Sequence, residues 1–309
     1  MSIVDYVCDA LCIEKMQLMH FAVTAPHRYK KYEIPKRSGN GTRTIAQPSK
    51  QLKFIQRIII SELEKILTPH PSAFAYIKGI SIKDNAEMHV KNRYLLKMDF
   101  KDFFPSITPD LMFQEYARFG VTFSPEDSAL LSNILFFKLR KNSKLKLSIG
   151  APSSPFISNI IMRHFDAVIS ELCQHKKISY TRYADDITFS SNIKNVLFEI
   201  PEAITVALKK EGYKCIKINK EKTVFSSKRN NRHVTGITIS NEDKLSVGRT
   251  KKRILTAAVH KFSLGYLSES DIEKLKGELS FVFFVEPAFK DRLIKKYGYD
   301  VCHKLWKHA

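Results

Sequence analysis

Two short stretches of the sequence place acidic residues where they could do chemistry. In Tyr180–Phe189, two β-type flanks enclose Asp185 and Asp186, which predicts a hairpin with two carboxylates at its tip. In Leu95–Pro105, an apolar strand ends at Asp99 and then meets aromatic residues and a proline. Each pattern alone is also compatible with a solvated turn or a turn-capping carboxylate, because Asp is common in turns.

Together the two stretches offer three carboxylates, on a strand end and on a neighbouring hairpin. An acid at the end of a buried strand is unfavourable unless it is paired or bound to a metal. Carboxylate oxygens are preferred ligands of Mg²⁺, and two such ions suit phosphoryl transfer. One ion activates the attacking hydroxyl and the other stabilises the pyrophosphate leaving group. The combination therefore predicts a two-metal site more specifically than either stretch does.

The distribution of charge indicates a polyanionic partner. Lys and Arg number 51 against 31 Asp and Glu, which gives a net charge of +20. Residues 27–57 hold nine basic residues and one acid, and residues 206–261 hold fifteen basic residues and four acids. Because these two tracts carry nearly all of the excess, nucleic acid is the favoured partner. An anionic membrane is less favoured, since no basic amphipathic anchor with an aromatic face is apparent.

The composition fits a globular protein of two or three lobes. Of the 309 residues 44% are hydrophobic, with 21 Phe and 12 Tyr, which excludes an intrinsically disordered chain. The longest apolar run, residues 279–285, is far shorter than the roughly 20 residues of a bilayer span. Acids interrupt the apolar N-terminus, so we expect no secretory signal. The five cysteines form no CxxC pair, so we expect reduced thiols and a cytoplasmic location.

The elements that must position the acids are predicted as a mixture of helices and short strands. Strand patterns cover residues 94–100, 179–190 with a central break, 215–218 and 233–239. A helix is predicted over residues 49–67. Helix starts are predicted at Thr108, Ser124 and Ser270. The last of these forms a predicted capping box with Glu273. A further helix, from about Pro287, is predicted to end at Gly298. Without a regular alternation of helix and strand, the predicted class is α+β.

At the acidic residues the sequence resembles the reverse transcriptase family. Tyr183-Ala184-Asp185-Asp186 matches its YxDD motif, and Asp99 lies at the acid of its preceding palm motif. The resemblance covers roughly residues 30 to 290 and implies that the three acids bind two Mg²⁺ ions. It also implies a right-hand polymerase. The boundaries we expect are an N-terminal helical extension (1–32), fingers (33–93), a palm with interleaved fingers and palm helices (94–240), and a thumb (241–309).

Three basic residues match positions of that family that contact the incoming nucleotide. Lys36 and Arg43 correspond to triphosphate-binding cations of the fingers. Lys222 lies in Asn219–Thr223, which resembles the motif carrying a lysine near the pyrophosphate, where it would act as a catalytic general acid. It is preferred over Lys220 for that role. A lysine on a basic surface is often only solvated, so this alternative stays open for Lys36.

Two uncharged residues match nucleotide-binding positions as well. Phe104 lies five residues after Asp99 and corresponds to the aromatic steric gate beside a ribose 2′-OH, although a core phenylalanine would show the same pattern. Gly150 opens a match to the Gly-x-x-x-Ser-Pro motif, which begins a helix beneath template and nucleotide. The family usually has Gln before this glycine, whereas this chain has Ile149. That departure bears on nucleotide affinity or fidelity rather than on activity.

Within the family the likeness narrows to retron reverse transcriptases. Asn85-Ala86-Glu87-Met88-His89 fits their NAxxH element, and Val234-Thr235-Gly236 fits their VTG triplet. The resemblance implies that Asn85, His89, Val234, Thr235 and Gly236 help to select the cognate RNA. Both patterns are short, and His89 is also compatible with a structural histidine.

The predicted thumb begins with a cluster of cations. They are Arg249, Lys251, Lys252 and Arg253, ahead of an apolar helical stripe. We expect them to bind RNA by following the phosphates of an A-form duplex. A merely solvated helix start is disfavoured, because cations there oppose the helix dipole.

The resemblance implies an RNA-directed DNA polymerase that uses deoxynucleoside triphosphates to copy part of its own structured non-coding RNA. Priming from a guanosine 2′-OH would give branched RNA–DNA, and the complex would act in anti-phage defence beside a separate effector protein, away from membranes. Alternatives are a reverse transcriptase of an intron or diversity-generating element, and a non-catalytic RNA-binding scaffold, which the complete Asp triad disfavours. An RNA-dependent RNA polymerase is less favoured, since Phe104 would obstruct a ribonucleotide.

Overall fold

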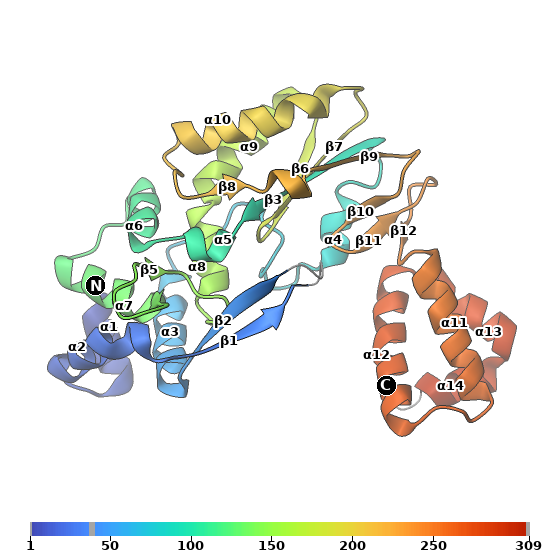
Figure 1. Ribbon diagram of the computed structural model, residues 1–309, viewed down its shortest axis with the longest axis horizontal. Helices are drawn as coiled ribbons and strands as arrows, with labels where there is room; N and C mark the ends of the chain where they lie inside the picture. The colour runs from blue at the N-terminus through green and yellow to red at the C-terminus, as the bar shows by residue number, and fades with distance from the viewer. Residues whose placement is uncertain (1, 37–40, 307–309) are drawn as a thin grey trace.

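The structure is a computed structural model that describes residues 2–36 and 41–306. Helices and strands are mixed in an elongated molecule, with the N-terminal helices at one end and the C-terminal helices at the other (Figure 1). The α+β class predicted from the sequence is confirmed. Within the described residues, no helix is both long enough and apolar enough to cross a bilayer.

A five-stranded antiparallel sheet carries the predicted acids. Its central strand is β3 (Tyr94–Lys101), which pairs on one side with β7 (Asp186–Ser191), and β7 pairs in turn with β6 (Ser179–Tyr183). On the other side β3 pairs with β8 (Lys217–Ile218) and β9 (Val224–Ser227). The end of β3 and the tip of the β6–β7 hairpin therefore lie side by side.

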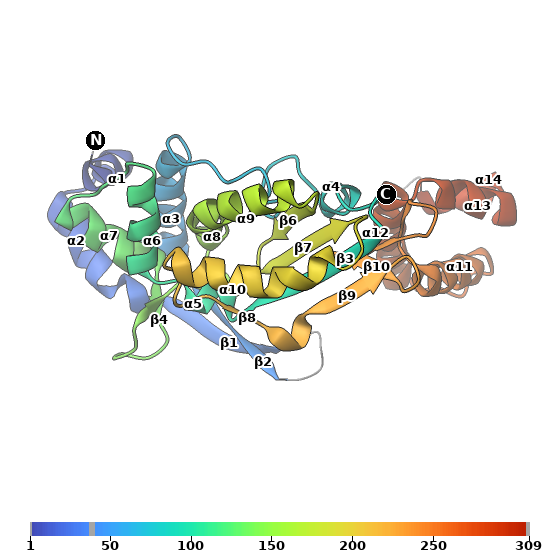
Figure 2. The same cartoon turned by 90° about the horizontal axis from the view of Figure 1, so that it is seen from above.

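Helices α8 (Ser154–Ile161), α9 (Arg163–His175) and α10 (Ile200–Lys210) pack with this sheet, and α9 and α10 lie along it (Figure 2). Short helices complete the region: α5 (Phe103–Ser106), η2 (Val196–Glu199) and η3 (Lys220–Lys222). Because β6 and β7 are buried along almost their whole length, the hairpin is rigidly placed on its helical support.

The N-terminal part shares its hydrophobic core with the sheet. One continuous cluster of buried side chains extends from Ile3 to Ile216. The elements that contribute to this part are α1 (Ile3–Leu11), α2 (Lys15–Thr24), η1 (Ala25–His27), β1 (Tyr29–Pro35), β2 (Thr42–Pro48), α3 (Lys50–Leu63), α6 (Pro109–Arg118), α7 (Pro125–Leu135), β4 (Phe137–Lys138) and β5 (Leu145–Lys146). The β1–β2 hairpin extends away from this core, and only Tyr29 of β1 is buried.

The C-terminal helices form a second core of their own. They are α11 (Arg249–Ser263), α12 (Glu269–Val285), α13 (Ala288–Tyr297) and α14 (Tyr299–Trp306). A third, small cluster joins this bundle to the sheet. It is built on α4 (Ile82–Glu87), β10 (Arg232–Val234), β11 (Ile237–Ile239) and β12 (Leu245–Ser246).

Three sequence expectations need correction. The predicted capping box of Ser270 with Glu273 was wrong. Helix α12 is capped two residues earlier, by Ser268, whose hydroxyl accepts from the amide of Asp271. Residues 233–239 form a hairpin rather than one strand, since Thr235 (φ 46°) and Gly236 (φ 84°) make a two-residue turn. Helix α3 ends at residue 63, four residues before the predicted end.

His89 connects α4 to the palm sheet. Its side chain is fully buried, with Nδ1 2.7 Å from Ser190 Oγ and Nε2 2.8 Å from Thr181 Oγ1. Burial lowers the pKa of His89 to about 3, so the ring is neutral in the native state. The unfolded chain takes up a proton near pH 6.5, whereas the folded chain does not.

We predict that this difference makes the protein acid-sensitive. The stability that His89 contributes is complete above about pH 6.5 and is lost as the pH falls toward 3, by about 1.4 kcal/mol per pH unit. In urea unfolding between pH 7 and 4.5, the free energy of unfolding of His89→Gln should therefore fall less steeply than that of wild type. His20→Gln, at an exposed site, is the control. Parallel curves for His89→Gln and wild type would contradict the prediction.

Candidate active site

Three carboxylates meet where β3 and the β6–β7 hairpin run side by side. Asp99 lies opposite Asp186 in the β3–β7 register, and the amide of Phe100 donates to the carbonyl of Asp185 at 3.0 Å. Asp99 is buried, Asp185 is half-buried and Asp186 is exposed to solvent. The backbone itself therefore brings together the strand end and the hairpin tip that the sequence predicted.

The electrostatics of these acids follow from their crowding. Burial raises the pKa of Asp185 and the charge of Asp99 adds to it, while Lys222 and Arg43 act in the opposite direction. Although the Asp186 residue as a whole is exposed, desolvation of its carboxylate by the surrounding protein, followed by the charges of Asp185 and Asp99, raises its pKa to about 6. Asp185 and Asp186 thus bind protons more tightly than isolated carboxylates do, because their negative charges are crowded together with that of Asp99.

Lys222 supplies a cation at this point. Its Nζ lies 2.8 Å from Asp99 Oδ2, and Asn219 Nδ2 donates to Asp99 Oδ1 at 3.3 Å. Burial lowers the pKa of Lys222, but the hydrogen bond to Asp99 and the charges of the three acids outweigh it, so the pKa is raised. The amide of Asn219 also donates to the carbonyl of Asp99 at 2.7 Å, which fixes η3 against β3.

The donor set suits a hard divalent cation, although it is not a ready-made cage. Over residues 2–36 and 41–306, no three His, Cys, Asp or Glu side chains are gathered into a metal cluster. Lys222 occupies one oxygen of Asp99, and the remaining carboxylates repel each other. All available donors are carboxylate oxygens, the ligands that Mg²⁺ prefers. The crowded negative charge that raises the pKa of Asp186 is what a bound cation would relieve.

The predicted nucleotide-binding cations lie on the β1–β2 hairpin. Arg43 in β2 is exposed, and its charge affects the pKa of Asp185, which places it near the acids. Lys36 follows β1, and its amide donates to the carbonyl of Gly41 at 3.0 Å, so it stands at the far end of the hairpin with its side chain in solvent. Arg43 is therefore near the acids, whereas Lys36 is known only to lie at the far end of the hairpin.

Phe104 lies in α5, and Gly150 lies in the loop before α8, against β2. The ring of Phe104 is half-buried and packs edge-on against Phe103, with 5.5 Å between centroids. Gly150 has φ 117°, and a Cβ there would lie 3.1 Å from Ile45 Cγ2 and 3.3 Å from the carbonyl oxygen of Ala46. A side chain would thus push β2 away, so the glycine is required by close approach.

The two elements assigned to RNA selection contact each other. Asn85 Nδ2 donates to Thr235 Oγ1 at 3.4 Å, and Thr235 Oγ1 donates to the carbonyl of Ile82 at 3.4 Å. Val234 is fully buried in the small cluster that also contains Ala86. Although they are 150 residues apart in sequence, NAxxH and VTG form one joint between α4 and the β10–β11 hairpin.

This placement corrects part of the RNA-binding expectation. The side chains of Asn85, His89 and Val234 are almost completely buried, and both ring nitrogens of His89 contact protein hydroxyls. They have no surface with which to touch RNA. Thr235 is half-buried and Gly236 is exposed, so only the hairpin turn reaches the surface.

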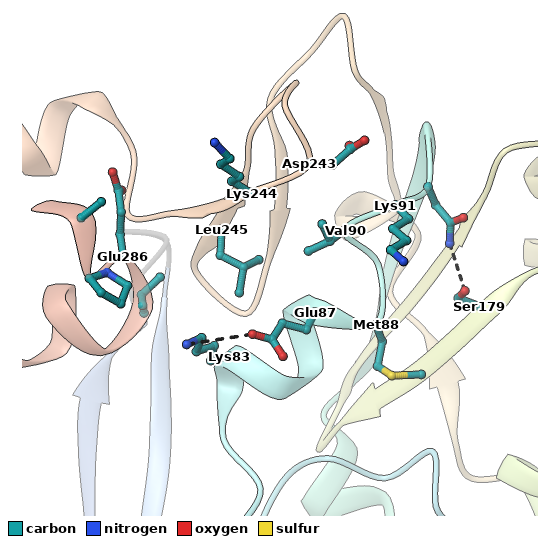
Figure 3. A pocket seen from close by; sticks show the side chains of 14 residues that line it. Lys83, Glu87, Met88, Val90, Lys91, Ser179, Asp243, Lys244, Leu245 and Glu286 are labelled. Carbon is teal, nitrogen blue, oxygen red and sulfur yellow. Dashed lines mark hydrogen bonds and ion pairs between the residues drawn. The ribbon is translucent and has the colours of Figure 1, made fainter.

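A pocket of about 610 Å³ lies beside this joint, between α4, the segment before β12 and the start of α13. Figure 3 shows Met88, Lys91, Lys244 and Leu245 around it. Its acids are paired with cations: Glu286 with Lys252, and Glu87 with Lys83 inside the pocket. The lining mixes apolar and charged groups without a converging set of polar atoms.

The four cations at the start of α11 do not share one role. Arg249 and Arg253 are exposed. Lys252 Nζ lies 3.0 Å from both carboxylate oxygens of Glu286, which ties α11 to the end of α12, and Lys251 Nζ lies 5.4 Å from the centre of the Phe281 ring. Lys252 is therefore engaged in a structural ion pair, and its expected contact with RNA stays a prediction.

Three residues near the acids were not assigned a role from the sequence. Asn219 holds Asp99, and Arg182 donates to the carbonyl of Ala184 at 3.2 Å. Tyr76 adopts a positive φ of 62°, and Asp185 contributes to raising its pKa after burial. A tyrosine in the left-handed region is uncommon, but its φ cannot be read from the sequence.

Comparisons with known proteins agree with this geometry. A family model described as "Reverse transcriptase (RNA-dependent DNA polymerase)" matches residues 34–239. Retron Ec83 reverse transcriptase of Escherichia coli is 47% identical, over 91% of this chain and 90% of that protein. Retron Ec86 reverse transcriptase, also of Escherichia coli, is 32% identical, over 95% of this chain and 89% of that protein.

Among solved structures, telomerase from Candida albicans in complex with a fragment of telomeric RNA is similar in fold, with a TM-score of 0.50 at 13% identity. The match covers 88% of this chain and 59% of that one. The chain belongs to the reverse transcriptase family and, within it, to the retron reverse transcriptases, so it is an RNA-directed DNA polymerase with the right-hand α+β fold that its motifs predicted.

Proposed function

We propose that this enzyme copies part of its own structured non-coding RNA into DNA by two-metal phosphoryl transfer. The observation that carries the proposal is the pairing of Asp99 with Asp186 beside Asp185, with Lys222 bonded to Asp99. Asp99, Asp185 and Asp186 would hold two Mg²⁺ ions. When bound, the ions activate the attacking hydroxyl and stabilise charge on the pyrophosphate.

The chain's own groups prepare the site for this chemistry. Lys222 neutralises Asp99 before the substrates arrive, and its raised pKa keeps a proton on Nζ. In this position Lys222 would act as the general acid toward the leaving pyrophosphate. Arg43 and Lys36 would bind the triphosphate from the β1–β2 hairpin, and Phe104 would exclude a 2′-OH.

The RNA partner and the product are proposed from the retron relatives. The 47% identity with a retron reverse transcriptase over most of both chains supports a dedicated structured RNA as template. We propose priming from a guanosine 2′-OH, a branched RNA–DNA product, and a cytoplasmic role in anti-phage defence with a separate effector protein. The exposed Arg249 and Arg253, together with Lys251, would contact duplex phosphates.

Replacement of the acids tests the chemistry. Asp185→Asn or Asp186→Asn should reduce primer extension in Mg²⁺ by at least about 10³-fold, because the metal ligands are lost. Binding of the copurifying RNA, which depends on cations elsewhere, should stay within about twofold of wild type. The melting temperature should not fall, since each change removes repulsion. Substantial extension by the double variant would rule out the triad.

The side chain at position 104 tests sugar selection. Phe104→Ala should raise the incorporation of ribonucleotides relative to deoxynucleotides by about 10-fold or more, equivalent to about 1.4 kcal/mol of relieved clash. Single-nucleotide incorporation kinetics with each sugar provide the measurement. Equal discrimination by variant and wild type would place the gate at another residue.

The raised pKa of Asp186 predicts how metal binding depends on pH. Because its pKa is about 6 rather than about 4, protons compete with Mg²⁺ at pH 5 but hardly at pH 7. Without metal, ionisation of Asp186 lowers stability as the pH rises through 6. The rise in melting temperature caused by Mg²⁺ should therefore increase from pH 5 to 7 and then level off. Asp186→Asn should flatten this increase, and a pH-independent increment in wild type would contradict it.

A further inference from the structure

Arg182 and Asp166 form a fully buried ion pair behind the catalytic hairpin. Arg182 Nη2 lies 2.7 Å from Asp166 Oδ2, and Arg182 Nε donates to Asp166 Oδ1 at 2.9 Å. The hydroxyl of Tyr180 donates to the same oxygen at 2.7 Å. A buried pair of this kind is tolerated only when its hydrogen bonds are satisfied, and here they are.

The third nitrogen of Arg182 points to the catalytic turn. Nη1 donates to the carbonyl of Ala184 at 3.2 Å and to Asn159 Oδ1 in α8 at 3.1 Å. Asn159 Nδ2 in turn donates to the carbonyl of Ala75 at 2.8 Å. One guanidinium therefore joins α8, α9 and the residue that directly precedes the two hairpin acids.

The backbone of Arg182 is held as firmly as its side chain. Its amide donates to the carbonyl of Ser72 at 2.7 Å, and the amide of Phe74 donates to its carbonyl at 2.8 Å. Residue 73 and Arg182 form a parallel bridge, so the segment after Ala73 runs beside the turn. Neither the backbone nor the guanidinium of Arg182 can shift without breaking buried hydrogen bonds.

The turn needs such support because its backbone is strained. Ala184, the first of the two turn residues, has φ 57°, which for a residue with a Cβ costs on the order of 1 kcal/mol. Repulsion among the three acids adds a further force that favours relaxation of the hairpin tip. The bond from Arg182 Nη1 to the Ala184 carbonyl opposes both.

We propose that Arg182 is a positioning residue for the metal-binding acids: its guanidinium, fixed by Asp166 and Asn159, holds the Ala184 turn so that Asp185 and Asp186 face Asp99. This inference rests on the proposed two-metal function. Only arginine can serve, because its planar fork reaches three acceptors in different directions, whereas lysine has a single nitrogen.

Arg182→Lys is the first test. The variant keeps a cation opposite Asp166 but cannot also hold the Ala184 carbonyl. With the full-length protein and its copurifying RNA, we expect RNA affinity to stay within about twofold and kcat to fall on the order of 10²-fold, since misplacement by about 1 Å has effects of that size. Mn²⁺ affinity, measured by electron paramagnetic resonance without nucleotide, should fall about 10-fold.

Tyr213→Phe is the matched control. The Tyr213 hydroxyl is buried in the same core, within hydrogen-bond distance of Glu115 Oε2 (2.8 Å) and of the carbonyl of Ile161 (3.1 Å), and it accepts from the amide of Phe165 at 3.2 Å rather than contacting the turn. Its loss should lower the melting temperature but leave Mn²⁺ affinity and kcat of the folded protein unchanged. If Arg182→Lys behaves like this control, Arg182 only stabilises the core and the proposal is overturned.

A second variant covers the case in which Arg182→Lys does not fold. Arg182→Met with Asp166→Leu replaces the pair by apolar side chains, which is often neutral or stabilising. It lacks the donor to Ala184, so the same losses of kcat and Mn²⁺ affinity are expected, and wild-type values would overturn the proposal. Asp185→Asn separates the two hypotheses: if it still bound Mn²⁺ and polymerised, the proposed function itself would fail.

Discussion

The mutual repulsion of three carboxylates is the constraint around which the rest of the palm is arranged. Asp99, Asp185 and Asp186 can share one place only because the backbone is fixed by strand pairing on both sides of β3. Lys222 and Asn219 form hydrogen bonds to the carboxylate of Asp99, and Arg182 donates to the carbonyl of Ala184 in the hairpin turn. The native fold thus keeps charges together that would separate in a looser chain, and a bound cation would relieve their crowding.

The acids and their setting could be predicted because the information is local. An apolar strand ending in Asp99 and a two-residue turn between β-type flanks define both partners of the β3–β7 pairing within a few residues. The role of His89 could not be predicted in the same way. Its partners Ser190 and Thr181 lie 101 and 92 residues away, and nothing near His89 distinguishes a buried ring from one that faces RNA.

The basic tracts show the same limit of local information. The sequence counts Lys252 and Arg232 toward a polyanion-binding surface, yet Lys252 is bonded to Glu286, and Arg232 is fully buried with bonds to backbone carbonyls and to Asp243. Charge density identifies the class of partner, because it reflects the total field. It does not identify the contacts, because long cationic side chains also serve as tethers between elements.

The continuity of the core determines which parts of the molecule are free to rotate. Apart from α4, helices α1 to α10 share a single cluster of buried side chains, so the N-terminal part cannot turn as a separate body without opening apolar contacts along the whole sheet. Two parts of the molecule are not held by this cluster. The outer part of the β1–β2 ribbon, residues 30–35 and 42–43, extends beyond the cluster into solvent, and the C-terminal helices have their own core and are attached through the small α4–β10–β11 joint. The outer part of the ribbon can therefore bend without moving the C-terminal bundle, so the proposed contacts to the nucleotide and to the duplex are mechanically independent.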